Sequence, residues 1–341
     1  MELRWNLIKS IDAAGRGSLE WGSRPVLLLC TETGEYQEFQ YMKRRKVWIA
    51  VLIVVIGLID ILGLNYLSVV NTAKARFAVY QEKARILQTA QGKVSYIDEG
   101  TGAPVLVCHG ICGGYDQGVD VLKDKTDSCR VIAPSRFGYP GSDLPENASV
   151  DLQVETYVEL LDTLGIEKAY VLGTSAGGTV AIRMAIAHPE RCMGLILYCS
   201  GYPDKQASEK KPGISGPPAF VCNDFCMWLA SPFFEPLMGM DGDTIRTILP
   251  IADRKEGILF DSRVVNGATA GHFEDYNLEK AQVPVLIIHA KDDKLASFAS
   301  AEAWSRRIPD CTFLPIPDGG HTMRGHAAEI SEAVDLFIKA E

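Results

Sequence analysis

Short, mostly apolar runs of residues recur along the last two thirds of the chain. They span residues 105–108, 130–133, 169–172, 194–198, 285–288 and 312–314. Strands that are buried on both faces have such continuous runs, whereas strands with one solvated face alternate apolar and polar residues. The segments 86–90 and 93–97 come before these runs and predict an antiparallel pair that turns at Gln91-Gly92.

Segments with helical spacing separate these runs. Val154, Tyr157, Val158 and Leu161 follow a spacing of three and four residues, and Gly165 ends the pattern. Residues 178–188 show the same periodicity directly after the run 169–172. This alternation predicts an α/β domain, with a mostly parallel sheet and helices on both of its faces.

A much longer apolar stretch lies at residues 47–70, and Asp60 is its single charged residue. About 20 such residues are enough to cross a hydrocarbon core of roughly 30 Å. Asp60 costs about 2.5–3.5 kcal/mol at the centre of such a helix, and about a dozen Val, Ile and Leu residues, at roughly −0.3 to −0.6 kcal/mol each, offset that cost. The stretch therefore predicts one transmembrane helix, and through it a lipid bilayer as a partner.

The sequence around this stretch suggests an orientation. Residues 43–46 are Lys-Arg-Arg-Lys, which favours a cytoplasmic N-terminus and places the α/β domain on the outer side. We expect an N-terminal extension at 1–41, an anchor at 42–72 and the main domain at 73–341. Residues 1–41 lack a clear periodic element, so Met42 is a candidate start of translation, with a short cytoplasmic tail as the alternative. A cleaved signal peptide and a buried core helix are the alternatives to an anchor.

A serine lies on a predicted sharp turn between a strand and a helix. Gly173-Thr174-Ser175-Ala176-Gly177 joins the run 169–172 to the helical segment 178–188. A nucleophile on such a turn has a strained backbone, and the flanking glycines let the strand and the helix pass close to it. The context predicts that Ser175 is a catalytic nucleophile.

Composition narrows the class of partner. The net charge is −9 and the hydrophobic content is 47%, so the chain is globular and lacks the basic face that nucleic acid requires. The nine cysteines are scattered, and their disulfide state stays open. Cys222 and Cys226 are four residues apart but lack a second pair of ligands, so we expect neither a metal nor another cofactor.

Several motifs stand at the ends of the predicted strands. They are His109-Gly110-Ile111-Cys112-Gly113-Gly114, Ser135-Arg136-Phe137-Gly138-Tyr139, the elbow at Ser175, Ala290-Lys291-Asp292-Asp293 and Gly319-Gly320-His321. Their order, Ser then Asp then His, is similar to that of the α/β-hydrolase superfamily over roughly residues 86–341. The stretch 109–118 resembles a bacterial, membrane-anchored subgroup of serine hydrolases, and this narrower likeness implies no substrate.

The resemblance assigns roles to these residues. It implies that Ser175 attacks, that His321 is the general base and that Asp293 orients the imidazole, with the adjacent Asp292 as a solvated neighbour. It also nominates the backbone N–H groups of Ile111 and Ala176 as the oxyanion hole. His109 and Arg136 are expected to brace loops.

Residues 201–271 interrupt the rhythm of strands and should form a mobile helical cap. The cap is rich in apolar residues, and we expect Trp228, Phe233 and Phe234, together with Cys112, to line the substrate pocket. Such a lining favours a small hydrophobic ester or acyl substrate. The sequence therefore predicts a membrane-anchored serine hydrolase, most simply a carboxylesterase.

Other functions remain open on the same residues. An acyltransferase, a thioesterase, an amidase and a C–C bond hydrolase can all use this triad. Dehalogenases and epoxide hydrolases of the superfamily have an aspartate at the elbow, so Ser175 disfavours them. A binding protein that retains the fold without turnover is the alternative from another class.

Overall fold

The computed structural model describes residues 23–205 and 215–339. By contacts the chain divides into two units, Met1–Asn65 and Tyr66–Glu341. The second unit contains one sheet of eight strands, ordered β1-β2-β4-β3-β5-β6-β7-β8. The strands are β1 (Arg85–Thr89), β2 (Gly92–Gly100), β3 (Ala103–Cys108), β4 (Cys129–Pro134), β5 (Ala169–Thr174), β6 (Cys192–Tyr198), β7 (Val285–Ala290) and β8 (Cys311–Ile316).

The sheet matches the predicted pattern strand by strand. β1 and β2 form the antiparallel opening pair, and β2 also pairs antiparallel with β4. The six strands from β4 to β8 in this order are parallel. All six residues of β7 are buried, as expected for a strand that is covered on both faces. The carboxyl ends of the parallel strands therefore meet at one edge, where the loops carry the predicted site.

Helices cover both faces of the sheet. One core includes α4 (Val150–Thr163), α5 (Gly177–Ala187) and α11 (Phe298–Ser305). The other core includes α3 (Tyr115–Val121) and α12 (Ala327–Lys339). Ser149 caps α4 by accepting a hydrogen bond from the Leu152 N–H, and Gly165 ends that segment with a positive φ of 67°.

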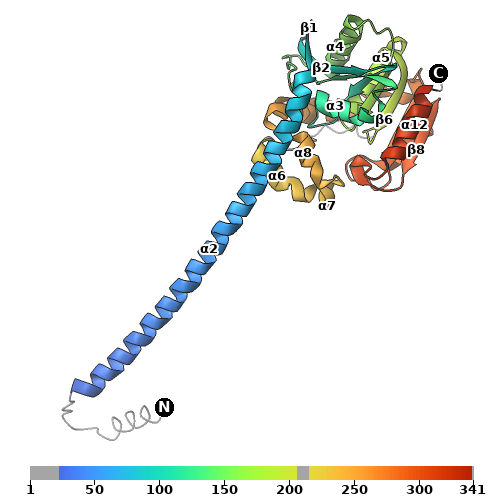
Figure 1. Ribbon diagram of the computed structural model, residues 1–341. Helices are drawn as coiled ribbons and strands as arrows, with labels where there is room; N and C mark the ends of the chain where they lie inside the picture. Colours follow the sequence, from blue (N-terminus) through green and yellow to red (C-terminus); the bar gives the residue numbers. More distant parts are fainter. Residues whose placement is uncertain (1–22, 206–214, 340–341) are drawn as a thin grey trace. The chain divides into compact units, whose positions relative to one another are not determined.

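Short helices form the predicted cap between β6 and β7. They are α6 (Asp224–Ala230), α7 (Phe234–Met238), α8 (Ile245–Ile248), α9 (Lys255–Phe260) and α10 (Asn266–Gly271). In Figure 1, α6, α7 and α8 lie together on the side of the sheet away from α4. Met227, Phe234 and Ile248 belong to a third apolar core inside this cap.

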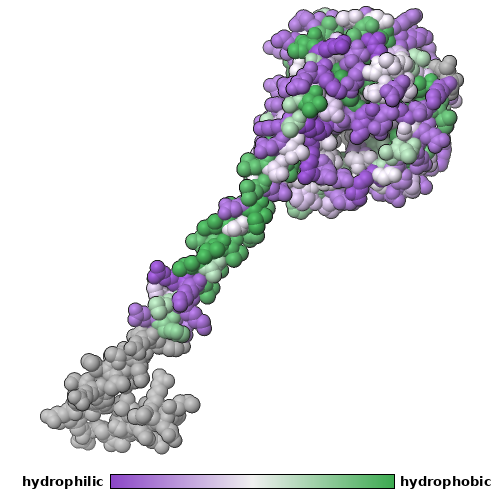
Figure 2. All heavy atoms as spheres, viewed as in Figure 1, coloured by the Kyte–Doolittle hydropathy of each residue, from purple (hydrophilic) through white to green (hydrophobic). Residues whose placement is uncertain are grey.

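The long apolar stretch lies in helix α2 (Ser23–Lys83). The helix begins well before residue 42, so the expectation that residues 1–41 lack an element is wrong for 23–41, where an uninterrupted run without proline after Pro25 permits a helix. Residues 1–22 lie outside the described residues. Residues 38–83 include a window that is apolar and unburied, long enough to cross a bilayer, although a signal sequence meets the same test. Figure 2 shows this apolar band on the helix, with polar residues before it.

The last turns of α2 belong to the second unit and pack within it. Ala73 is fully buried, and Tyr66 lies edge-on to Phe225 and Trp228 of α6. Deeper in the domain, the Arg76 guanidinium bonds to Asp116 of α3. The end of α2 is thus part of the fold of the α/β domain.

Candidate active site

Ser175 lies on a strained turn between β5 and α5. Its φ is +51°, in the left-handed region that residues with a side chain rarely adopt. A Cβ at Gly177 would clash with the carbonyl oxygen of Cys108, and one at Gly173 would lie 2.6 Å from the Cα of Gly178. The two glycines therefore have the steric role that the sequence predicted for them.

Three side chains predicted to act together meet at this turn. His321 Nε2 lies 2.9 Å from Ser175 Oγ, and His321 Nδ1 lies 2.9 and 3.0 Å from the two carboxylate oxygens of Asp293. The carboxylate can only accept, so Nδ1 carries the proton and Nε2 accepts from the serine hydroxyl. This arrangement has the geometry that activates a serine for nucleophilic attack.

Asp293 is held in its ionised form. Burial opposes its charge, but hydrogen bonds from His289 and His321 and from the Ala296 N–H outweigh burial, and the pKa of Asp293 lies below its ordinary value. The carboxylate therefore keeps its charge at neutral pH, where it can hold the imidazole and stabilise a positive charge on it.

The neighbouring Asp292 bonds to the backbone beside His321 rather than to its ring. Its Oδ1 accepts a hydrogen bond from the Gly320 N–H at 2.9 Å, directly before His321. The cap holds the same loop, because Gly239 O accepts from the His321 N–H at 3.0 Å. The imidazole is thus positioned by its backbone as well as by Asp293.

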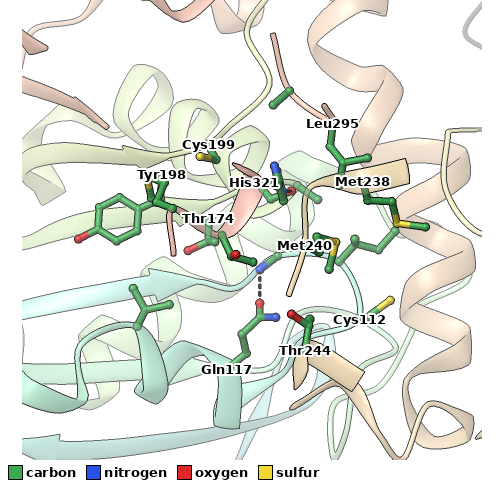
Figure 3. A pocket seen from close by; sticks show the side chains of 18 of the residues that line it. Cys112, Gln117, Thr174, Tyr198, Cys199, Met238, Met240, Thr244, Leu295 and His321 are labelled. Atoms are coloured by element: carbon green, nitrogen blue, oxygen red, sulfur yellow. Dashed lines mark hydrogen bonds between the residues drawn. The ribbon is translucent and has the colours of Figure 1, made fainter. Parts of the chain in front are cut away.

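The two predicted oxyanion donors lie in different loops, Ile111 after β3 and Ala176 between β5 and α5. Within the described part of the chain, neither the Ile111 N–H nor the Ala176 N–H has a hydrogen-bond acceptor. The Gly110 N–H donates to Gln117 Oε1 at 2.7 Å, as Figure 3 shows. Both predicted donors therefore remain available for a ligand.

Buried polar side chains brace this loop. His109 Nδ1 lies 2.8 Å from Gly110 O, and His109 Nε2 accepts from the Arg136 N–H at 3.0 Å. Burial and the nearby Arg136 lower the pKa of His109 well below its ordinary value, so this ring is neutral. The Arg136 guanidinium bonds to both oxygens of Asp261 at 2.5 and 2.6 Å and to Gly110 O at 3.2 Å. Both residues brace the loop, as expected from the sequence.

A cavity of about 1430 Å³ opens at Ser175 and His321. Cys112 and Phe234 line it, as do Met238 and Met240 of the cap (Figure 3). Two residues that were predicted to line the cavity do not line it. Trp228 packs against Tyr66, and Phe233 is 58% exposed. The prediction rested on the apolar character of these two residues, but the short cap helices orient their side chains away from the cavity.

Cys199 is a site residue that the sequence analysis missed. It follows β6 directly, with φ +41°, and its thiol contacts Asp293. Burial raises its pKa, so the thiol stays protonated. Its position at the carboxyl end of a parallel strand was the available signal in the sequence.

Cys199 also belongs to a group of three potential metal ligands, the one such group among the described residues. Its thiol, the Asp293 carboxylate and a nitrogen of His321 lie within 4.8 Å of one another. Asp293 and His321 already bond to each other, so the triad accounts for the group.

Comparison with known proteins shows which class the chain resembles. A family model described as alpha/beta hydrolase fold matches residues 103–225. Haloalkane dehalogenase 2 of Mycobacterium tuberculosis is 28% identical over 121 residues, 35% of this chain and 42% of that protein. A 2-hydroxymuconate semialdehyde hydrolase of Pseudomonas sp. is 38% identical over 108 residues, 30% of this chain and 38% of its own. These matches span less than half of either relative.

Solved structures share the fold over a greater length. A thermophilic esterase from Thermogutta terrifontis has a TM-score of 0.57 at 24% identity and covers 75% of this chain and 98% of its own. A structure described as a membrane phospholipase A has a TM-score of 0.62 at 17% identity, covering 84% and 97%. The domain has the α/β-hydrolase fold, and residues 103–225 match the model of that family.

Proposed function

We propose that the protein is a serine hydrolase that cleaves a hydrophobic ester through an acyl-enzyme. One observation supports this above all others. His321 Nε2 lies 2.9 Å from Ser175 Oγ, and Asp293 accepts from the other ring nitrogen. Fixed geometry of this kind makes an otherwise weak hydroxyl nucleophilic.

The reaction follows from this arrangement. His321 takes the proton of Ser175 as Oγ attacks the ester carbonyl, and Asp293 stabilises the imidazolium. The N–H groups of Ile111 and Ala176 stabilise the negative charge on the carbonyl oxygen. The imidazolium then protonates the departing alcohol, and water releases the acyl group by the same steps in reverse.

The surroundings of the triad favour an apolar substrate. The cap presents Phe234, Met238 and Met240 to the cavity, and methionine side chains adapt to flexible ligands. We propose that residues 47–70 anchor the chain in a membrane and that 73–341 act on its outer side. An enzyme held at a bilayer meets apolar esters where they accumulate.

The first test is labelling with a fluorophosphonate probe, using the full chain in lipid nanodiscs. We expect the wild type to label and Ser175→Ala not to label. Hydrolysis of p-nitrophenyl butyrate should fall by about 10⁶ in kcat in this variant, because the triad acts as a unit. Ser305→Ala, on α11, is the matched control and should label like the wild type.

Two outcomes would contradict the proposal. Labelling that survives in Ser175→Ala would mean that another residue reacts. A folded wild type that does not label would mean that the serine is not activated, and would favour the binding-protein alternative. Labelling without turnover of any ester would also favour a binding protein.

A C–C bond hydrolase is the second candidate. The observation in its favour is the 38% identity to a 2-hydroxymuconate semialdehyde hydrolase over 108 residues. Incubation with 2-hydroxymuconate semialdehyde, followed by its absorbance, separates the two candidates. Loss of absorbance that depends on Ser175 and exceeds ester turnover would favour the C–C hydrolase.

A further inference from the structure

The cavity at Ser175 extends in two directions, and one of them leaves the cap. The cap lobe is lined by residues of α6, α7 and α8. The second part, which we call the helix lobe, lies between α3 with η1 (Lys123–Lys125) and α12. We propose that the helix lobe binds a linear aliphatic chain of the ester. This inference rests on the proposed function and adds a substrate class to it.

The residues that line the helix lobe come from both walls. On the first wall they are Gln117 and residues 120–125, and on the second they are Ala327, Ile330, Ser331 and Val334. Residues three and four apart lie on the same side of a helix, so the second wall is one face of α12. This face and the segment 120–125 border the same cavity as Ser175.

The helix lobe begins at the reacting groups. Gln117 bonds to the Gly110 N–H beside the predicted oxyanion donors, and Met323 follows His321 by two residues and also lines the cavity. A chain attached to an ester at Ser175 can therefore enter the helix lobe without crossing the cap. A solvent pit on the surface of the domain would lack this continuity with the nucleophile.

Tyr198 and Thr174 stand at the junction of the two lobes. In Figure 3 the Tyr198 ring points away from Met238 and Met240, on the other side of Thr174. Tyr198 is 7% exposed and lines the cavity. Thr174 Oγ1 is buried and has no hydrogen-bond partner among the described residues. Buried polar groups normally have partners, so a ligand with an oxygen at the junction fits this site.

The walls of the lobe suit an uncharged chain. Val121, Ile330 and Val334 are apolar, and the Asp120 carboxylate is engaged by Arg76 and Tyr80. At the far end the Lys125 ammonium bridges the walls, donating to Ser331 O at 2.8 Å and pairing with Asp335 at 2.7 Å. The charges of Asp120 and Lys125 are thus engaged within the protein, whereas Lys123 and Asp124 are exposed to solvent.

The length of the helix lobe predicts the length of the aliphatic chain that it can hold. The cavity volume of about 1430 Å³ exceeds the roughly 300–1,000 Å³ of ordinary ligand pockets. Val334 follows Ala327 by seven positions, which is about 10 Å along the helix at 1.5 Å per residue. An extended chain advances about 1.2 Å per bond, so the lobe fits roughly eight or nine bonds.

The test compares esters of different chain length in the full chain in nanodiscs. Ile330→Trp fills the lobe, and Leu336→Trp, on the exposed side of α12, is the control. We measure kcat/KM for p-nitrophenyl butyrate, octanoate and decanoate, and for butyl, octyl and decyl butyrate. These two series distinguish an acyl chain from an alcohol chain in the lobe.

In the wild type we expect kcat/KM to rise with chain length in one of the two series. In Ile330→Trp the ratio of kcat/KM for the ten-carbon ester to kcat/KM for the four-carbon ester should fall at least about tenfold in that series. The reason is that one methylene in an apolar pocket contributes a factor of roughly 10–200. Leu336→Trp should keep the wild-type ratio. A ratio that Ile330→Trp leaves unchanged in both series would overturn the inference. Val121→Phe, from the opposite wall, gives the same test if Ile330→Trp does not fold.

Failure of the proposed function gives a different result. In that case the wild type neither labels with fluorophosphonate nor hydrolyses any ester. The lobe is then judged by the effect of decanoate on Tm. A rise in the wild type that is lost in Ile330→Trp supports the aliphatic site, and no rise in the wild type overturns it.

Discussion

At the scale of single residues, two adjacent aspartates are candidates for the acid of the triad. Asp292 and Asp293 are adjacent and of the same type, and the sequence motif alone permits either. In the structure Asp293 faces His321 Nδ1, whereas Asp292 accepts from the Gly320 N–H. The two carboxylates therefore hold the imidazole in different ways, one through its ring and one through its backbone.

Replacing each aspartate by asparagine should separate these roles. Asp293→Asn removes the charge that fixes the tautomer and stabilises the imidazolium, so we expect kcat to fall by about 10⁴. In Asp292→Asn the amide oxygen still accepts from Gly320, and loss of at most one ordinary hydrogen bond limits the effect to about tenfold. Steady-state kinetics on p-nitrophenyl butyrate measures both. Equal losses would refute the assignment.

At the scale of elements, buried charges join α2, α3 and the cap. Arg254 of the cap and Asp116 of α3 are both fully buried, and their two hydrogen bonds are 3.0 Å long. Arg76 of α2 lies 2.9 Å from the same carboxylate. Arg254 also donates to Gly113 O in the loop of the predicted oxyanion hole. Packing of these elements and the shape of the site are therefore linked.

Asp116→Asn should destabilise the domain strongly. The substitution leaves the buried Arg254 without its charged partner, and breaking such a pair costs about 3–5 kcal/mol. Asp243→Asn is the matched control, because its pair with Arg246 is exposed and worth at most about 1 kcal/mol. Unfolding in urea gives the free energies. Similar losses in the two variants would contradict the role of the buried pair.

The difference between wild type and Asp116→Asn should depend on pH. Burial opposes the charge of Asp116, but Arg254 and Arg76 outweigh it and lower its pKa below the ordinary 3.8. The unfolded chain then binds this proton more readily, so the stabilisation is complete above about pH 4 and is lost as pH falls through the folded pKa. The gap between the two proteins should be widest near neutrality and should narrow in acid. A gap that widens in acid would reverse this sign.

At the scale of the whole molecule, the chain combines a domain of the α/β-hydrolase fold with an apolar helix. The described part of α2 has exposed Val, Ile and Leu residues through 47–64, where a soluble protein would place polar residues. This exposure is expected if the helix lies in lipid. An anchor would hold an apolar cavity at the surface of the membrane.

Two charges in the apolar stretch should release the protein from membranes. Val54→Arg together with Ile56→Arg adds about 5–7 kcal/mol to the cost of insertion. We expect the wild type to stay in the pellet after alkaline carbonate extraction and the variant to appear in the supernatant. Leu229→Arg with Leu237→Arg, on exposed positions of the cap, is the control and should stay in the pellet. Extraction of the wild type would contradict an anchor.

The sequence alone was sufficient to locate the strands along the chain and the elbow, and the family resemblance nominated the members of the candidate triad. These features depend on local patterns. A run such as 169–172 is apolar because both faces of its strand are covered, and the glycines around Ser175 are required by the turn itself. Residues at the carboxyl ends of parallel strands share one edge, so their order along the chain already brings Ser175, Asp293 and His321 to the same side.

Only the tertiary structure decided which side chains meet. The contact of Cys199 with Asp293 and the exclusion of Trp228 and Phe233 from the cavity both depend on the relative rotation of elements far apart in sequence. The same holds for the end of α2 against α3 and for the helix lobe between α3 and α12. An apolar pattern shows that a residue is buried, but its neighbours are set by packing between elements, which no local pattern contains.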